Sequence, residues 1–467
     1  MTEQIVTRVR FGRANAFLLV VAPWVFGAAM ADLPAAYAAY EKHDFPLAFQ
    51  AFHELAELGQ PLAQRNVAIM YMNAEGTEKS VARAYAWASL AVEGGAEKAG
   101  ELAAQLKPLL RPDEMKIVDD IRTQYGRSAL ETRLFPQFSE VNKPDEGTCR
   151  KLKVYEPTYP VDALREARQV NINVEFTIMP DGRARMPRMI NAFPSRPFEE
   201  AVRKSVLRSE FIPATFNGRA GPCLMSVLYR FVVRGKEASD YPDLGKFVKE
   251  ARAKAEAGEV RSQMLYGMLL EGLPQLKGQR SDALPWFLKA AQAGAPLAQY
   301  QVGYSILKGW GCQCEEPKGM MWLRKAAAAD QPDAQVTLAQ ATLRESQSVE
   351  SVARAKVWLE RAVAHDNRDA KFYLAALLAA APLAEARDAT RSAALLAQIF
   401  KAVDDDPTTF EIRAAAQAAS GDFAKATKNQ QKAVAMAKRL KWDLTSHNER
   451  LARYEAHEAW YGNLLPF

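Results

Sequence analysis

Residues 171–183 read NINVEFTIMPDGR, and this stretch divides the chain because it is the clearest β pattern in a sequence otherwise rich in alanine and in helical spacing. Its apolar residues at alternate positions are Ile172, Val174, Phe176 and Ile178. Such alternation places the apolar side chains on one face of a strand. Asp181 and Gly182 then predict a tight turn, because glycine readily takes a positive φ angle. The stretch therefore predicts one arm of a β-hairpin whose apolar face must be covered.

The residues after the turn predict a second strand, a helix and a last strand. The return strand, 183–193, contains Pro187, which cannot donate to a strand ladder and therefore marks an edge or a bulge. Ser195 is expected to cap a helix that includes Phe198. The side chains on one face of the last strand are Met225, Val227, Tyr229, Phe231 and Val233. Together these elements predict a compact α+β unit.

Helical repeats are predicted on both sides of this unit. In the C-terminal half, Trp286, Trp322 and Trp358 open similar motifs and are spaced 36 residues apart. A period of this size, filled with alanine-rich amphipathic stretches, indicates stacked helical hairpins that bury their apolar faces against their neighbours. Trp87 marks the same pattern more weakly near the N-terminus. These tryptophans are expected to pack in the repeat core and not to line a ligand site.

The residues around the second of these motifs resemble the Sel-like branch of the tetratricopeptide repeats. The resemblance rests on Gly303-Tyr304, Gly309, Gly311 and the segment 322–327. It implies that small residues let the two helices of a hairpin approach closely and that the tryptophan packs the second helix against the next repeat. Residues 418–437 resemble an ordinary tetratricopeptide hairpin, which is expected to serve as a cap.

The α+β unit resembles the TonB C-terminal domains. The shared landmarks are Tyr159-Pro160, Asp181-Gly182, Phe211-Ile212-Pro213-Ala214, Asn217-Gly218 and a last strand through Phe231. The resemblance implies a partner-binding role in the envelope, in which the last strand is an exposed edge that pairs with an extended peptide of an outer-membrane receptor. Carried over to this chain, the partner-binding residues are Ser226, Val227, Leu228, Tyr229 and Arg230.

The first residues have the layout of a secretory signal peptide. Arg8, Arg10 and Arg13 precede an apolar run over 14–29, and the small residues of Ala29-Met30-Ala31 suit a peptidase site. Residues 1–31 are therefore expected to be removed on export, the alternative being an uncleaved anchor. Export predicts a periplasmic location in a Gram-negative bacterium. A retained segment would instead place the chain at the inner membrane, facing the periplasm.

Export also makes the four cysteines candidates for disulfide bonds, with three possible pairings. Cys149 precedes the β segment and Cys223 opens its last strand, so a bridge between them would join the ends of the small domain. Cys312 and Cys314 would then be left for each other. Their Cys-Gln-Cys sequence lacks a nearby histidine and makes a poor zinc site. No metal, cofactor or catalytic residue is predicted.

Other function classes find little support. The net charge of +6 is spread over 467 residues without the basic stripe that nucleic-acid binding needs. His53-Glu54 begins like a metalloprotease helix but lacks the second histidine. The sequence has no Walker loop and no dinucleotide-binding glycine motif. An enzyme would need a cleft with clustered titratable groups, and the sequence contains no motif that indicates one. An enzyme is therefore the weakest alternative.

The expected fold is mainly α: an α-solenoid of helical-hairpin repeats with an inserted small, TonB C-terminal-like α+β domain. The expected segments are 1–31 (signal peptide), 32–148 (repeats), 149–236 (α+β domain) and 237–467 (repeats with a C-terminal cap). The expected function is an exported envelope adaptor without catalysis, which binds proteins through its edge strand and its repeat groove and meets the membrane only peripherally. The alternative is a TonB-type energy transducer in outer-membrane transport, anchored in the inner membrane. The chain lacks the long Pro-rich span usual in such transducers.

Overall fold

The computed structural model describes residues 33–57, 59–138, 149–166, 168–190, 196–216, 218–233, 242–278, 280–292, 294–346, 348–399 and 406–465. The predicted signal peptide, 1–31, and the predicted helix cap, Ser195, lie outside the described residues. Within the described ranges, no helix is both long enough and apolar enough to cross a membrane.

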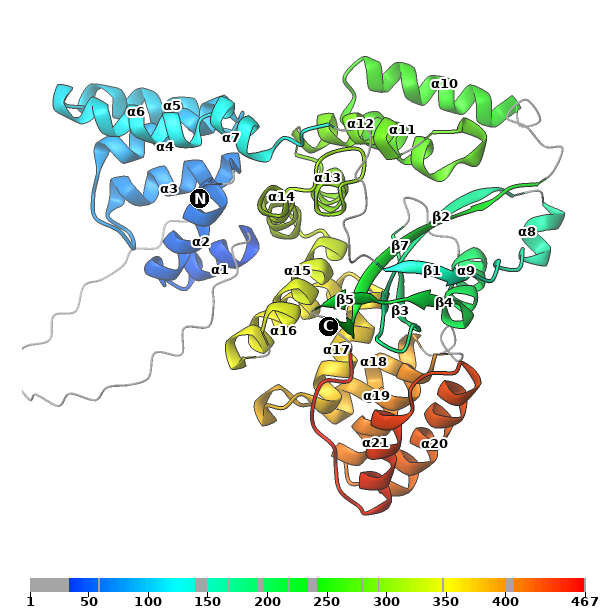
Figure 1. The fold of residues 1–467 in the computed structure, drawn as a ribbon. Coiled ribbons are helices and arrows are strands. Elements are labelled where there is room, and N and C mark those ends of the chain that lie inside the picture. Colours follow the sequence, from blue (N-terminus) through cyan, green and yellow to red (C-terminus); the bar gives the residue numbers. More distant parts are fainter. Residues whose placement is uncertain are drawn as a thin grey trace, which may run out of the picture.

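The N-terminal part of the chain consists of helices, most of which contribute to one core (Figure 1). They are α1 (Leu33–Glu41), α2 (Phe45–Glu57), α3 (Pro61–Asn73), α4 (Val81–Glu93), α5 (Ala99–Leu106), α6 (Met115–Tyr125) and α7 (Arg127–Leu134). Leu55, Val67 and Trp87 are buried together in this core. The side chain of Gln60 caps α3 by accepting the N–H of Ala63 at 2.7 Å. These helices confirm the hairpins predicted from the weaker N-terminal pattern.

The C-terminal part is a longer curved array of helices (Figure 1). They are α10 (Pro242–Glu256), α11 (Val260–Gly272), α12 (Arg280–Gln292), α13 (Pro296–Lys308), α14 (Glu316–Ala328), α15 (Pro332–Glu345), α16 (Val349–Ala364), α17 (Arg368–Ala380), α18 (Ala389–Ile399), α19 (Pro407–Ala419), α20 (Phe423–Arg439) and α21 (Thr445–Glu455). Trp322 and Trp358 are buried, as predicted for core residues. Trp286 is half-buried and packs edge-on against the ring of Tyr266 at 5.2 Å.

One hydrogen bond recurs in four of the hairpins. In each, a buried glutamine donates from Nε2 to a backbone carbonyl eight residues earlier, near the end of the preceding helix. The pairs are Gln64 to Ala56 (3.2 Å), Gln263 to Ala255 (3.4 Å), Gln299 to Ala291 (3.2 Å) and Gln335 to Ala327 (3.2 Å). A helix end leaves its last carbonyls without intrahelical partners, so this bond satisfies one of them and ties the two helices together.

The N-terminal helices are joined to the array through α7 and the residues after it. Trp322 Nε1 in α14 donates a hydrogen bond to the carbonyl of Leu134, and Lys318 Nζ donates to the carbonyl of Phe135 at 3.2 Å. The N–H of Gln313 donates to the carbonyl of Gln137 at 2.8 Å. The chain therefore contacts the array before it enters the α+β unit, and the unit is an insertion between two groups of helices.

The α+β unit lies on the inner side of the curved array (Figure 1). Its elements are β1 (Arg150–Lys153), α8 (Val161–Arg165), β2 (Val170–Ile178), β3 (Ala184–Met189), α9 (Arg196–Arg208), β4 (Glu210–Ile212), β5 (Ala214–Phe216), β6 (Arg219–Gly221) and β7 (Cys223–Phe231). The predicted turn forms at Gly182, where φ is +73° and the N–H donates to the carbonyl of Met179 at 2.8 Å. The predicted fold class, helical repeats with an inserted α+β unit, is confirmed.

Candidate functional site

The main sheet of the α+β unit has three antiparallel strands in the order β3–β2–β7. The outer strand β3 contains Pro187, and its register with β2 shifts between Glu175 and Thr177. The prediction of an edge or a bulge at this proline is therefore confirmed. On the other side, β7 pairs with β2 over its whole length, from Cys223 opposite Ile178 to Phe231 opposite Val170. In the part of the chain that the structure describes, β2 is the only strand paired with β7.

One face of this sheet is covered by α9. The buried side chains of α9 are Phe198, Val202, Ser205, Val206 and Leu207. The ring of Phe198 packs against the ring of Phe231 in β7, with centroids 4.7 Å apart. The ring of Tyr159 also packs against the Phe231 ring, at 5.5 Å. Ile172, Val174 and Phe176 complete the cluster from β2. The predicted helix and the predicted apolar strand face therefore meet as expected.

The opposite face of β2 carries polar side chains that are bound by the helical array. Asn171 Nδ2 donates to the carbonyl of Glu271 at 2.8 Å, and Asn173 Nδ2 donates to Oε1 of the same residue at 2.9 Å. Glu175 forms an ion pair with Lys308 of α13. Burial alone would raise the pKa of Glu175, but the charges of Lys308 and Arg188 lower it below its usual value. The ionised carboxylate therefore helps to hold β2 against the array.

Arg188 of β3 also contacts the helical array, and its side chain is only 4% exposed. Its guanidinium donates to the hydroxyls of Tyr300 and Thr337, each at 3.1 Å, and its Nε lies 3.4 Å from Oδ2 of Asp369. These three partners come from α13, α15 and α17, so one side chain spans three hairpins. Burial raises the pKa of Asp369, and the charge of Arg188 opposes that shift. The side chain of Asp369 is 25% exposed, so with Arg188 almost fully buried this ion pair is largely shielded from water.

These contacts change the interpretation of the repeat groove. Alternate helices α11, α13, α15 and α17 supply the residues that bind the sheet, and they lie along the inner side of the array (Figure 1). Along this stretch the polar face of β2 and β3 occupies the groove, apart from a cavity of about 250 Å³ that borders Glu175, Arg188 and Arg344. The groove is therefore not open there as the second binding surface that was expected. The sequence pattern concealed this, since polar residues on alternate strand positions usually face water.

The five expected partner-binding residues on β7 divide into two groups. Val227 and Tyr229 are 7% and 6% exposed and pack in the α9 core, so they offer a partner only their backbone. Ser226, Leu228 and Arg230 have their side chains on the other face, where Leu228 is 41% exposed. Sequence reasoning missed two further residues on that face, Leu224 and Val232, which are also exposed. Their spacing of four residues from Leu228 was the available signal, because alternate strand positions share a face.

A disulfide bond joins Cys149 to Cys223, the first residue of β7. It connects positions 74 residues apart in sequence and ties the start of the edge strand to the segment that precedes β1. Cys312 and Cys314 are free thiols, so the second pair expected from the sequence is not formed. Cys312 is buried, with its pKa raised to about 11 mainly by that burial. Cys314 Sγ instead lies 3.3 Å from the carbonyl of Leu307.

The described titratable side chains include one buried cluster outside the sheet, in which His447 and Arg450 both contact Glu411. Among the described residues, no group of three or more histidine, cysteine, aspartate or glutamate side chains is placed to hold a metal ion. His53 lies 3.6 Å from Glu57 and packs against the ring of Trp87, so it is part of the N-terminal core. The feature that stands out chemically is the edge of β7 that pairs with no described strand, while its other edge pairs with β2 along its whole length.

Comparisons with known families support this view of the two parts. Residues 155–233 match the Gram-negative bacterial TonB protein C-terminal family, and residues 61–95, 260–294 and 296–331 match the Sel1 repeat. The chain therefore combines a TonB C-terminal domain with Sel1 repeats on both sides of it. Both kinds of module generally mediate contacts between proteins, and the TonB C-terminal domain is a domain of the Gram-negative envelope.

Two solved structures are similar to this chain at low identity. One is a protective antigen present in uropathogenic Escherichia coli strains that displays an SLR fold; it is 16% identical with a TM-score of 0.36, and the match covers 93% of this chain and 74% of that one. The other is a Sel1 repeat protein from Oxalobacter formigenes, 18% identical with a TM-score of 0.33, over 46% of this chain and 94% of that one. No curated protein matches the chain significantly.

Proposed function

We propose that this chain is an exported periplasmic adaptor that binds an extended segment of another envelope protein along β7. The observation that carries the proposal is that β7 pairs with β2 on one side over its whole length, while no described strand pairs with its other side. A free strand edge presents unpaired N–H and C=O groups that an incoming strand can bond. In such β-augmentation the backbone supplies affinity, and side chains at alternate positions supply specificity.

The helical array suits this role as a rigid support. Asn171, Glu175 and Arg188 fasten the central and far strands to the array, so the sheet cannot easily turn its free edge inward. Leu224, Leu228 and Val232 leave an apolar stripe exposed beside that edge. A partner strand carrying apolar side chains on the matching face would cover this stripe while it completes the backbone ladder.

A photo-crosslinking side chain placed at Leu228 of the full chain tests the proposal in Gram-negative cells. We expect a light-dependent adduct, and we expect the crosslinked peptide to map to an extended segment of one envelope protein. A synthetic copy of that segment, added in excess, should prevent the adduct from forming. The control position is Val349, which is 64% exposed at the start of α16, far from β7 in the sequence. Equal adducts from both positions, or none from Leu228, would contradict the proposal.

The same experiment separates the adaptor from a TonB-type transducer. The family match over residues 155–233 is the observation that favours the transducer. A crosslinked partner that is an outer-membrane receptor, together with an N-terminal segment retained in the inner membrane, would support energy coupling. A chain that begins at Asp32 in the periplasmic fraction would support the adaptor.

A further inference from the structure

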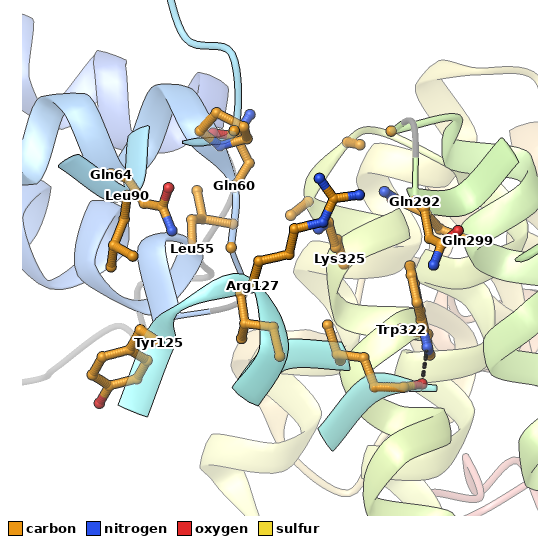
Figure 2. Close-up of a pocket in the computed structure, with 18 of the residues that line it drawn as sticks. Leu55, Gln60, Gln64, Leu90, Tyr125, Arg127, Gln292, Gln299, Trp322 and Lys325 are labelled. Carbon is orange, nitrogen blue, oxygen red and sulfur yellow. Dashed lines mark hydrogen bonds between the residues drawn. The ribbon is translucent and has the colours of Figure 1, made fainter. Parts of the chain in front are cut away.

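A cavity of about 430 Å³ lies between the N-terminal helices and the curved array (Figure 2). Its wall is formed on one side by the turn after α2 and the end of α4, and on the other by the turn after α12 and the end of α14. Helix α7 crosses between the two sides. The volume falls within the range of sites for small ligands, which are often found between domains. The cavity shares no lining residue with β7.

Most of the wall is apolar. Figure 2 shows Leu55 and Leu90 on the side of the N-terminal helices and Trp322 on the side of the array. Leu130 of α7 adds a further aliphatic side chain between them. Trp322 is held in place by its hydrogen bond to the carbonyl of Leu134. Such a wall favours a ligand with an apolar body, because covering these side chains removes apolar surface from water.

Among the described residues that line the cavity, the charged side chains are mainly positive. Arg127 and Lys325 both line it, and Glu93 is the one acidic residue among the described lining residues. Glu93 is already paired with Arg122 at 2.8 Å. Lys325 reaches across to the N-terminal helices, because a Cβ atom on Gly59 would lie 4.0 Å from its Nζ. Lys325 Nζ lies 5.8 Å from the centroid of the Trp322 ring, and burial lowers the pKa of Lys325 to about 8. A carboxylate beside this ammonium would favour its charged form.

The cavity wall also offers a hydrogen-bond acceptor. The side chain of Gln299 is almost fully buried, and its Nε2 is used by the repeat hydrogen bond to Ala291. Its Oε1 has no hydrogen-bond partner among the described residues. A buried polar atom without a partner costs free energy, so a ligand with a nearby N–H or O–H could gain by meeting it.

We propose that this cavity binds a monocarboxylate joined to an apolar chain. The carboxylate would lie at Lys325 and Arg127, and the chain would cover Leu55, Leu130 and Trp322. Two sources share this chemistry: a free fatty acid of medium length and the free C-terminal end of an apolar peptide. Because the ligand would bridge the N-terminal helices and the array, it would also tie those two parts together. The site is independent of the proposed role of β7.

Calorimetric titration of the full chain tests the proposal with matched acidic and neutral probes. The first pair is decanoate and decanol, and the second is acetyl-Ala-Leu-Phe as the free acid and as the amide. We expect at least one acid to bind at least about tenfold more tightly than its neutral partner. One hydrogen bond to a charged group contributes enough free energy to give a difference of that size. The acid that binds identifies the source. Failure of both acids, or equal binding of acid and neutral probe, would overturn the proposal.

Two variants locate the binding in the cavity. Lys325→Met keeps the aliphatic stem and removes the charge, so it should weaken acid binding about tenfold and leave the neutral probe unchanged. Leu130→Trp fills the cavity and should abolish binding even if the first variant folds poorly. The matched control is Lys289→Met, an exposed lysine of α12 that is not part of the wall. If both cavity variants bind the acid as the unmodified chain does, the cavity is not the site.

The pH dependence gives a separate readout. An anion prefers the protonated lysine, so the affinity of the ionised carboxylate should stay constant between about pH 6 and pH 7 and fall as the pH rises through the pKa of Lys325, about 8. The fall can approach tenfold per pH unit until the pKa of the occupied site is reached. Lys325→Met should lose this dependence. An unmodified chain whose affinity is constant between pH 7 and pH 9.5 would contradict the assignment.

Discussion

Arg188 Nε lies 3.4 Å from Asp369 Oδ2, and this ion pair joins strand β3 to helix α17 of the array across 181 residues of sequence. The side chain of Arg188 is only 4% exposed. The pair is therefore part of the buried contact that fixes the sheet and leaves β7 as its free edge. The account of this protein depends on that arrangement, because an edge on a loosely held domain could fold back against its own helices.

Replacing Arg188 with methionine should loosen this contact. The change removes the partner of the Asp369 carboxylate, which is 25% exposed, so the cost should be less than the roughly 3–5 kcal/mol typical of a fully buried pair. Urea unfolding measures the loss, and amide hydrogen exchange should show faster exchange in β2 and β3. Adding Asp369→Leu should recover much of the loss, because an apolar pair replaces the ionic one.

The control for that experiment is Arg252→Met in α10. Arg252 forms an exposed pair with Glu256 at 2.8 Å, so its loss should cost less than about 1 kcal/mol. If Arg188→Met and Arg252→Met destabilise the chain equally, the sheet is not anchored through Arg188.

Removing the disulfide should destabilise the α+β unit and free the start of β7. Cys149→Ser opens a loop whose ends are 74 residues apart, and loss of such a bond typically costs about 2–5 kcal/mol. Denaturant unfolding under non-reducing conditions measures the change. Cys314→Ser is the matched control, because it removes an exposed free thiol. Alkylation of four thiols in the native, oxidised chain would contradict the bond.

The packing of helix α21 should lose stability in mild acid because of His447. Burial lowers the pKa of His447 from its ordinary value of 6.5, while the nearby Glu411 opposes that shift and Arg450 adds to it. Below pH 6.5 the unfolded chain therefore takes up a proton that the folded chain does not, and stability falls until the folded pKa is reached. The slope is at most about 1.4 kcal/mol per pH unit for one group. His447→Gln should remove this part of the pH dependence, and an unchanged profile would refute its origin in His447.

Two neighbouring substitutions on β7 should have opposite consequences. Leu228→Lys changes an exposed side chain and should alter the unfolding free energy by no more than about 0.5 kcal/mol, while weakening the partner complex. Val227→Lys places a charge in the core beneath α9 and should lower the free energy of unfolding by about 3 kcal/mol or more. Thermal unfolding and partner binding separate the two. Equal stability of both variants would show that the side chains of β7 do not alternate as described.

Local patterns predicted the three strands of the main sheet and the helix that covers it, but not the short elements β1, α8, β4, β5 and β6. Alternating apolar residues, the turn at Gly182 and the helix containing Phe198 each depend on a few neighbouring residues, and each is present in the structure. The docking of the sheet was not predictable in the same way. Asn171 and Glu175 look like solvent-facing residues in the sequence, and their partners Glu271 and Lys308 lie about a hundred residues or more away.

The repeat glutamines show a signal that sequence reasoning could have used. Residues 59–64 read GQPLAQ, and residues 294–299 read GAPLAQ, with the final glutamine of each making the same buried hydrogen bond. The tryptophans mark the repeat period more visibly than these glutamines do, because tryptophan is a rare residue and glutamine is a common one. The cavity could not have been inferred, since it forms only where α7 brings Arg127 and Lys325 to the same space between two groups of helices.

The most direct test of the central claim is amide hydrogen exchange of the full chain with and without the synthetic partner segment identified by crosslinking at Leu228. The account predicts slower exchange over residues 223–231, with α16 unchanged, because a new strand bonds the free edge of β7. A scrambled peptide should leave both regions unchanged. Binding of the segment without any protection of β7 would contradict the account and move the interface elsewhere on the molecule.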